Sequence, residues 1–307
     1  MPSRYIDDWI ARFLAERPVR ANSLIITVYG DMIAVHGGTV WLGSFIRLVQ
    51  PLGLNERVVR TSVFRLIKEQ WLVAEQIGRR SYYSLTALGR RRFEHAYRRI
   101  YDAPSTDWNG QWQLVLTGGA LAPAQRDALR KELLWEGFGN IAPGVLAHPA
   151  ANADSLMDIL EDSAARDQVV VMQAHALGAT ASKPLQALVH ECWGLAAIAA
   201  DYQRFIERFR PALKAMRSAR NPDPQQCFVL RTLLMHEFRR VQLRDPQLPQ
   251  QLLSAHWPGR TARELCRDIY ILTQDGAKRH LMAVLETAQG PLPEAAPYYY
   301  TRFGGLR

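Results

Sequence analysis

The stretch Gly53–Gln70, GLNERVVRTSVFRLIKEQ, decides how the N-terminal third of the chain should fold. Asn55 follows a glycine-containing turn and is a good N-cap, so the pattern predicts a helix from Glu56 to about Glu69. One side of this helix is an apolar arc made of Val59, Val63, Leu66 and Ile67. The opposite side carries Arg57, Arg60, Thr61 and Lys68 with Phe64, and Arg65 lies at its edge. One face of the predicted helix therefore packs and the other is cationic.

Two helices are predicted before this stretch. Asn22-Ser23 can cap the first, whose apolar residues recur at three and four spacings until Gly37-Gly38. Thr39 can cap the second, which ends before Pro51. Two helices joined by a short turn, the second exposing Arg and Thr in its N-terminal half, are typical of a helix-turn-helix that reads the major groove of DNA. For one isolated helix, a solvated charged face would be the commoner interpretation.

A basic hairpin is predicted directly after the cationic helix. Residues 71–77 and 81–85 read as strands around Gly78-Arg79-Arg80, and a further helix begins at Thr86. A basic hairpin beside a recognition helix is a wing, whose arginines can reach phosphates or the minor groove. This order of elements favours a winged helix-turn-helix domain. The candidate DNA-binding residues are Arg57, Arg60, Thr61, Arg65, Lys68, Arg79 and Arg80.

The distribution of charge supports this interpretation. The chain has a net charge of +9, and residues 20–101 hold thirteen Lys or Arg against five acidic residues, a net +8. A positive excess confined to one segment of domain size is typical of a nucleic-acid-binding module. Charge alone would also allow a membrane surface or an acidic protein as the partner.

The rest of the chain has a different character. A linker is expected at residues 102–110, followed by a β-α-β-β-α-β order typical of a ferredoxin-like domain. Long helices come next, the first of them at Leu185–Arg210, and the tail PYYYTRFGGLR is expected to be mobile at its end. The predicted class is an α+β multidomain protein. Its predicted parts are an N-terminal extension at 1–20, a winged helix-turn-helix domain at 21–101, the linker at 102–110, a ferredoxin-like middle domain at 111–178 and a helical C-terminal effector and dimerisation domain at 179–307.

Several classes of protein are disfavoured. There is no run of eighteen apolar residues, and the acidic residues near the N-terminus do not fit a signal peptide, so we expect a cytoplasmic protein with no membrane partner. The three cysteines, Cys192, Cys227 and Cys266, fit neither a disulfide framework nor a CxxC zinc site.

No catalytic motif is recognisable either, since GxSxG, GxGxxG and GxxxxGK[ST] are absent. His236-Glu237 resembles the start of HExxH, but residue 240 is arginine. We therefore predict no enzyme, no catalytic residues, no metal and no cofactor. The alternative is a metal-dependent nuclease on the ferredoxin-like domain, with an acid such as Asp107 or Asp167 holding the metal.

The C-terminal helices contain a second cationic group made of Arg231, His236, Arg239, Arg240 and Arg244. One interpretation is a charged exterior face balanced by Glu237 and Asp245. The functional alternative is a pocket for an anionic effector, because guanidinium groups bind phosphates and carboxylates through paired hydrogen bonds. These five residues are the candidate effector-binding residues.

Several long segments, in order, resemble the PaaX-like repressors of phenylacetic acid degradation operons. They include SLIITVYGDMIAVHGG, WLGSFIRLVQPLGLNERVVRTSVFRLIKEQWL, GRRSYYSLTALGRRRFEHAYRRIY, WNGQWQLVLT and LLMHEFRRVQLRDPQLPQQLL, and the similarity runs from Asn22 to about Ala283. The resemblance implies a homodimeric repressor of phenylacetate catabolism that binds double-stranded operator DNA. It further implies phenylacetyl-CoA, or a related acyl-CoA, as the effector that releases the DNA, but no effector-binding motif can be carried over residue by residue.

Overall fold

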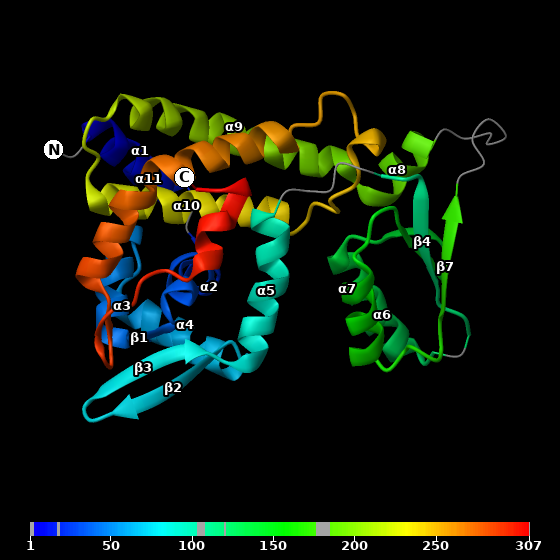
Figure 1. Ribbon diagram of the computed structural model, residues 1–307, viewed down its shortest axis with the longest axis horizontal. Helices are drawn as coiled ribbons and strands as arrows, with labels where there is room; N and C mark the ends of the chain where they lie inside the picture. Colours follow the sequence, from blue (N-terminus) through cyan, green and yellow to red (C-terminus); the bar gives the residue numbers. More distant parts are fainter. Residues whose placement is uncertain (1–2, 17–18, 103–107, 120, 176–184, 307) are drawn as a thin grey trace. The chain divides into compact units, whose positions relative to one another are not determined.

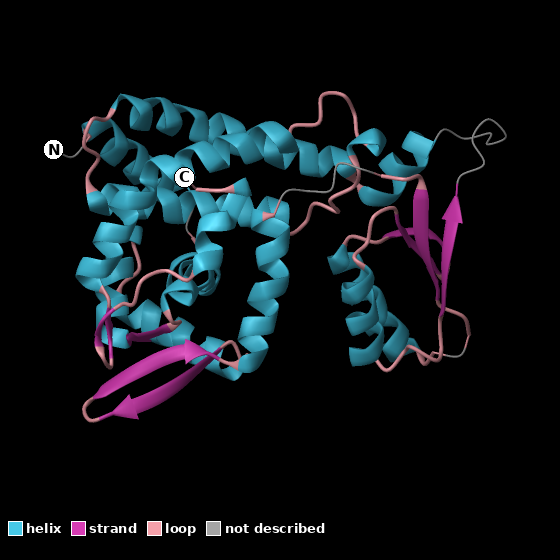
Figure 2. Cartoon of the chain, in the orientation of Figure 1, coloured by secondary structure: helices cyan, strands magenta, loops and turns pink. Residues whose placement is uncertain are grey.

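The computed structural model describes residues 3–16, 19–102, 108–119, 121–175 and 185–306. These residues form a mixed α+β structure in which helices predominate (Figure 2). The chain divides into two compact units, each assembled from separate segments. The first unit comprises Met1–Asp102, Arg204–Arg240 and Thr261–Arg307, and the second comprises Ala103–Gln203 and Val241–Arg260. The predicted domains are consecutive in sequence, and their boundaries stay predictions. The predicted linker 102–110 falls largely on residues 103–107, which lie outside the described residues.

The N-terminal segment of the first unit starts with two helices, α1 (Arg4–Glu16) and α2 (Ala21–Val28). Helix α2 continues through a π-helical turn, η1 (Tyr29–Ile33), and a 3-10 turn, η2 (Ala34–His36). The elements that follow are β1 (Thr39–Trp41), α3 (Leu42–Val49), η3 (Gln50–Leu52), α4 (Glu56–Lys68), β2 (Leu72–Ile77), β3 (Arg80–Leu85) and α5 (Ala87–Tyr101). The strands form an antiparallel sheet in the order β1-β3-β2 (Figure 1).

Two of the expected helix starts are wrong. Helix α2 begins at Ala21 with Arg20 as its N-cap, so the predicted cap at Asn22-Ser23 lies inside the helix. Residues 39–41 form a strand, because Val40 pairs with Tyr83 of β3 and its side chain is fully buried. The second helix therefore begins at Leu42, after a chain reversal at Gly37 and Gly38, whose φ angles are 87° and 78°.

The C-terminal segments complete the first unit. They contribute parts of α9 (Leu195–Ser218), α10 (Pro224–Gln242) and α11 (Gly259–Val284), followed by β8 (Glu286–Thr287), β9 (Gly290–Pro291) and η6 (Pro297–Gly304). Helix α1 packs against α9, where the Trp9 ring centroid lies 5.3 Å from that of Phe209. The end of the chain was expected to be mobile, but Arg302 and Phe303 are buried in the unit. The tail is therefore part of the core.

The second unit contains a four-stranded antiparallel sheet in the order β5-β6-β4-β7. Its elements are β4 (Gln111–Leu116), α6 (Pro123–Glu136), β5 (Gly139–Ala142), β6 (Val145–His148), α7 (Ala153–Asp162) and β7 (Val170–His175). Helices α6 and α7 cover one face of the sheet (Figure 1) and share a core with it that includes Val115, Leu129 and Leu160. This β-α-β-β-α-β order agrees with the predicted ferredoxin-like arrangement.

The helix expected at Leu185–Arg210 is two helices, α8 (Leu185–Trp193) and α9. Gly194 separates them with a φ angle of 57°, a conformation that glycine adopts at little cost. A short 3-10 turn, η5 (Gln250–Leu252), lies in the proline-containing segment of the second unit. Among the described residues, no helix combines the length and the apolar character needed to cross a membrane.

Candidate functional site

The cationic face of α4 is exposed along the helix. Its exposed residues are Arg57, Val58, Arg60, Thr61, Phe64, Arg65 and Lys68. The Arg60 guanidinium lies 2.7 Å from a Glu56 carboxylate oxygen one turn earlier. Phe64 is 56 % exposed, and the Lys68 ammonium lies 4.7 Å from its ring centroid. The face thus combines positive charge with an exposed aromatic ring.

The opposite face anchors α4. Val59, Val63 and Leu66 are buried as the periodicity predicts. The predicted cap is confirmed, since the Asn55 side chain accepts a hydrogen bond of 3.0 Å from the Val58 amide. Gly53, with a φ angle of 80°, forms the turn that precedes the helix. These contacts orient the cationic face outward.

The two arginines of the hairpin differ in their surroundings. Arg79 is exposed at the tip, directly after Gly78, which has a φ angle of 61°. Arg80 begins β3, and its guanidinium lies 4.1 Å from the Trp41 ring centroid. Arg80 also donates a hydrogen bond of 2.8 Å to the carboxylate of Glu286 in β8. Arg47 donates a second hydrogen bond of 2.8 Å to the same carboxylate. Although its partial desolvation acts in the other direction, these bonds hold the pKa of Glu286 below its ordinary value.

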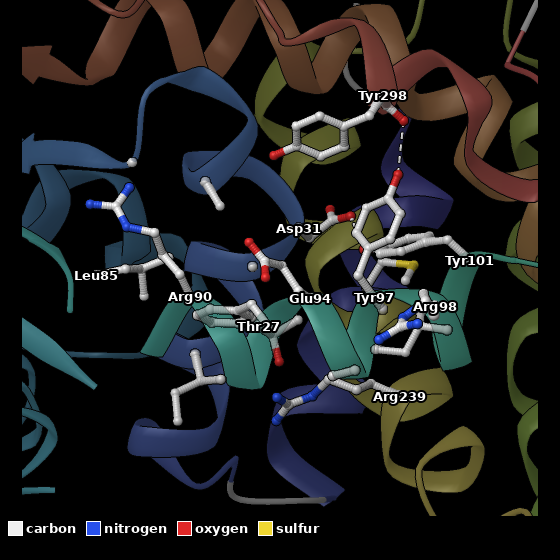
Figure 3. Close-up of a pocket in the computed structure, with 18 residues that line it drawn as sticks. Thr27, Asp31, Leu85, Arg90, Glu94, Tyr97, Arg98, Tyr101, Arg239 and Tyr298 are labelled. Atoms are coloured by element: carbon white, nitrogen blue, oxygen red, sulfur yellow. Dashed lines mark hydrogen bonds between the residues drawn. The ribbon is translucent and has the colours of Figure 1, made fainter. Parts of the chain in front are cut away.

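A cavity of about 560 Å³ lies inside the first unit (Figure 3). Its walls come from α2, η1, η2, β3, α5, α10 and η6, and much of the lining is apolar, including Ile26, Phe93, Ile100 and Met235. This volume is within the range of about 300–1,000 Å³ that small-molecule sites occupy. Polar groups in the lining come from Arg90, Glu94, Tyr97, Arg98, Arg239 and Tyr298. The cavity is therefore chemically suited to a ligand with an apolar part and an anionic part.

Asp31 lies at the wall of this cavity and at the centre of a buried polar cluster. Its carboxylate accepts hydrogen bonds from Arg231 Nε at 2.9 Å, Arg302 Nη1 at 3.0 Å and the Tyr101 hydroxyl at 2.6 Å. Tyr270 donates a further bond of 2.9 Å. Burial alone would raise the pKa of Asp31, but the two guanidinium groups more than offset this and lower it. The cluster joins the N-terminal segment of the unit to both C-terminal segments.

The candidate effector residues do not gather at one place. Arg239 lines the cavity, and its Nη2 donates a hydrogen bond of 2.9 Å to the Ser23 hydroxyl. Arg231 belongs to the Asp31 cluster, and His236 is buried with its Nδ1 3.2 Å from the Thr27 hydroxyl. Arg240 and Arg244 are exposed and pair with Glu237 and Asp201, as in the interpretation of a charged exterior face.

Sequence reasoning missed the residues that complete the cluster and the cavity. The burial of Asp31 could have been inferred from the sequence, because a carboxylate inside an apolar helical pattern needs a buried partner. No sequence pattern indicated the role of Arg302, because it lies in a glycine-rich tail 271 residues away from Asp31. Glu286 likewise could not be connected to the hairpin from spacing alone, since it is 206 residues from Arg80.

The two aspartates suggested as metal ligands of a nuclease, Asp107 and Asp167, do not support such a site. Asp107 lies outside the described residues, and Asp167 is exposed. Within the described ranges, no group of three or more His, Cys, Asp or Glu side chains is arranged to hold a metal ion.

Comparisons with known proteins cover most of the chain. Three family models match in order: PaaX-like protein at residues 20–89, PaaX protein central Cas2-like domain at 105–186 and PaaX-like protein C-terminal domain at 193–283. The transcriptional repressor PaaX of Escherichia coli K12 is 40 % identical over 302 residues, which is 98 % of this chain and 95 % of the relative. The solved structure of the uncharacterized protein Rv0674 from Mycobacterium tuberculosis is similar with a TM-score of 0.52 and 25 % identity. The match covers 85 % of this chain and 97 % of Rv0674.

Proposed function

The chain belongs to the PaaX-like protein family, and on this premise we propose that it is a transcriptional repressor with a winged helix-turn-helix and an acyl-CoA effector. The relative that matches 98 % of the chain is a regulator of transcription rather than an enzyme. The observation that carries the proposal is the exposed cationic face of α4, held outward by a buried apolar face.

The order of elements supports the winged helix-turn-helix. Helix α2 is followed by β1, α3, α4 and the β2-β3 hairpin, and β1 pairs with β3 to complete a small sheet. In this arrangement α4 is the recognition helix, and its N-terminal half enters the major groove. Arg57, Arg60, Thr61, Arg65 and Lys68 contact bases and phosphates, while Arg79 and Arg80 reach the backbone beside the helix.

A homodimer would place two such helices on the two halves of a palindromic operator. Edge strand β7 offers a surface for self-association, because Val170, Val171 and Met172 are 55 %, 43 % and 48 % exposed. Exposed apolar edge strands are ready to pair with another chain. The effector is phenylacetyl-CoA or a related aryl-acyl-CoA, which releases the repressor from its operator.

Binding to DNA upstream of the protein's own gene and neighbouring operons tests the proposal. Fluorescence anisotropy at near-physiological salt compares this DNA with a scrambled fragment, with and without phenylacetyl-CoA. Specific binding that the thioester abolishes and free phenylacetate does not is the expected result. Equal affinity for the scrambled fragment would refute the repressor, whereas specific binding that ignores the thioester would refute only the effector.

A matched pair of variants tests the interface itself. Arg57→Ala on α4 should weaken operator binding by about 1–3 kcal/mol and relax selectivity, because it removes a contact at the recognition helix. Arg130→Ala is the control, since Arg130 is an exposed arginine on α6 of the second unit and its loss changes the net charge equally. Equal losses of affinity in the two variants would show that net charge, rather than the α4 face, determines binding.

A further inference from the structure

The cavity in the first unit contains a guanidinium group with an unmet hydrogen-bonding requirement. Arg239 comes from α10, and its Nε is buried without a hydrogen-bond partner among the described residues. Burial lowers the pKa of Arg239 to about 10, because desolvation disfavours the charged form. A buried donor left without an acceptor is costly, so an anionic oxygen in the cavity would be stabilised there.

Further cationic groups line the same cavity. Figure 3 shows Arg98 of α5 and Arg239 of α10 in the lower right of the view, and Arg90 of α5 at the opposite end. The same lining contains the aromatic Phe93 and the aliphatic Ile100, and the carboxylate of Glu94 lies between Arg90 and Arg98 in the view. An apolar stretch bordered by arginines matches an aryl-acyl group attached to a phosphate-bearing carrier.

Helix α5 connects this cavity to the candidate DNA-binding elements. It begins two residues after β3 ends at Leu85, and its N-cap Thr86 also donates a hydrogen bond of 2.5 Å to the Gln70 carbonyl. The Phe93 ring, which lines the cavity, packs edge-on against Trp71 with a centroid distance of 5.6 Å. Arg92 donates a bond of 3.2 Å to the Glu69 carbonyl at the C-cap of α4. A displacement of α5 would therefore move the hairpin and the end of α4 together.

We propose that this cavity is the effector site, and that the aryl-acyl part of an acyl-CoA inserts between α5 and α2 while Arg98 and Arg239 bind its phosphates. This inference rests on the proposed acyl-CoA effector and names where it binds and how it acts. The ligand shifts α5, and through α5 it changes the position of α4 and the hairpin. Its effect on DNA affinity is set by the difference in its affinity for the DNA-bound and DNA-free conformations.

Filling the cavity tests the site. Ala96 of α5 lines the cavity, so Ala96→Leu adds bulk where the ligand would lie. Ala87→Leu is the control, because Ala87 is on the same helix but exposed and outside the lining. Calorimetry measures the affinity for phenylacetyl-CoA, and anisotropy measures its effect on bound operator. We expect Ala96→Leu to weaken thioester binding about tenfold or more with operator binding retained, and Ala87→Leu to match the wild type.

The possible outcomes distinguish failure of the proposed binding site from failure of the proposed acyl-CoA effector. If Ala96→Leu binds the thioester and releases DNA like the wild type, the cavity is not the site, although the acyl-CoA effector stands. If the wild type itself neither binds nor responds to the thioester, both the effector and this inference fail. Ala34→Leu fills the same cavity from η2 and replaces Ala96→Leu if that variant does not fold. Arg239→Gln should reduce the affinity for phenylacetyl-CoA about tenfold to a hundredfold, because it removes a charge-assisted hydrogen bond.

Discussion

Asp31 is a buried carboxylate that two buried arginines share. It is 3 % exposed, and Arg231 and Arg302 both form ion pairs with it. Each guanidinium would be strongly disfavoured in this position without the carboxylate, because a buried charge needs a partner. Tyr270 and Tyr101 complete the arrangement with hydrogen bonds to the same carboxylate. One side chain of the N-terminal segment therefore determines whether two C-terminal side chains can remain buried.

Replacing Asp31 tests this dependence. Asp31→Asn keeps the size of the side chain and removes its charge, so it leaves two buried guanidinium groups uncompensated. We expect the free energy of unfolding to fall by about 3–5 kcal/mol in urea denaturation. Asp275→Asn on α11 is the control, since Asp275 is exposed and its replacement should change stability by about 0.5 kcal/mol or less.

The same variant should change the acid response. The pKa of Asp31 is lowered in the folded protein, so its contribution is present above the ordinary pKa of about 3.9 and is lost as pH falls below it. The wild type should therefore lose stability more steeply than Asp31→Asn between about pH 4 and pH 2. Parallel acid titrations followed by circular dichroism compare the slopes, and equal slopes would show that Asp31 contributes nothing to acid unfolding.

At the scale of elements, the hairpin exposes one arginine at its tip and restrains the other in an ion pair. Glu286 of β8 pairs with Arg80 and Arg47, whereas Arg79 lies exposed at the tip. Glu286 is thus a negative charge fixed between two arginines of the segment that carries the positive excess. Any phosphate that approaches Arg80 has to compete with this carboxylate.

Two variants separate these roles. Arg79→Ala should reduce the slope of log K against log salt concentration by about 0.9, because one phosphate contact is lost. Glu286→Gln should raise operator affinity, because it removes a competing carboxylate and frees both arginines. Anisotropy titrations between about 50 and about 200 mM salt measure both effects, because phosphate contacts change DNA affinity strongly over this range. A lower affinity for Glu286→Gln would mean that Glu286 orients the hairpin for binding rather than competing with DNA.

Individual elements were predictable where the pattern was local and long. The α4 cap and its apolar arc follow directly from Asn55 and the 3.6-residue period. Strand β1 was missed because three residues show no clear periodicity, and its conformation is set by pairing with β3. The tail was misjudged for a related reason, since η6 is ordered by tertiary contacts of Tyr299 and Arg302 rather than by its own sequence.

At the scale of the whole molecule, α4 and the hairpin, the candidate DNA-binding elements, share a compact unit with the C-terminal segments. This arrangement could not be predicted from the sequence, because hydrophobic periodicity identifies helices without indicating which of them pack together. The cavity shows the same limit. Its lining combines Ile26, Phe93, Met235 and Tyr298, which belong to four separate elements. Of the cationic group predicted at 231–244, only Arg239 lines this cavity.

A fragment containing residues 1–102 tests the shared unit. This fragment retains α4 and the hairpin but lacks α10, α11 and η6, so its buried apolar side chains and Asp31 would be exposed. We expect it to melt well below the intact chain and to bind operator weakly. Circular dichroism melting and anisotropy provide the measurements, with full-length protein as the control. Native-like melting and affinity of the fragment would show that the N-terminal segment folds by itself.

The burial of Arg302 also bears on how the repressor is made. During synthesis α4 and its hairpin leave the ribosome early, whereas Arg302 emerges only after the 271 residues that separate it from Asp31 have been made. Until then, Asp31 lacks one of its two guanidinium partners. The nascent polypeptide therefore acquires its stable form only after Arg302 has left the ribosome. Products shortened by a premature stop codon would remain partly open, and cellular proteases would remove them before they could occupy an operator.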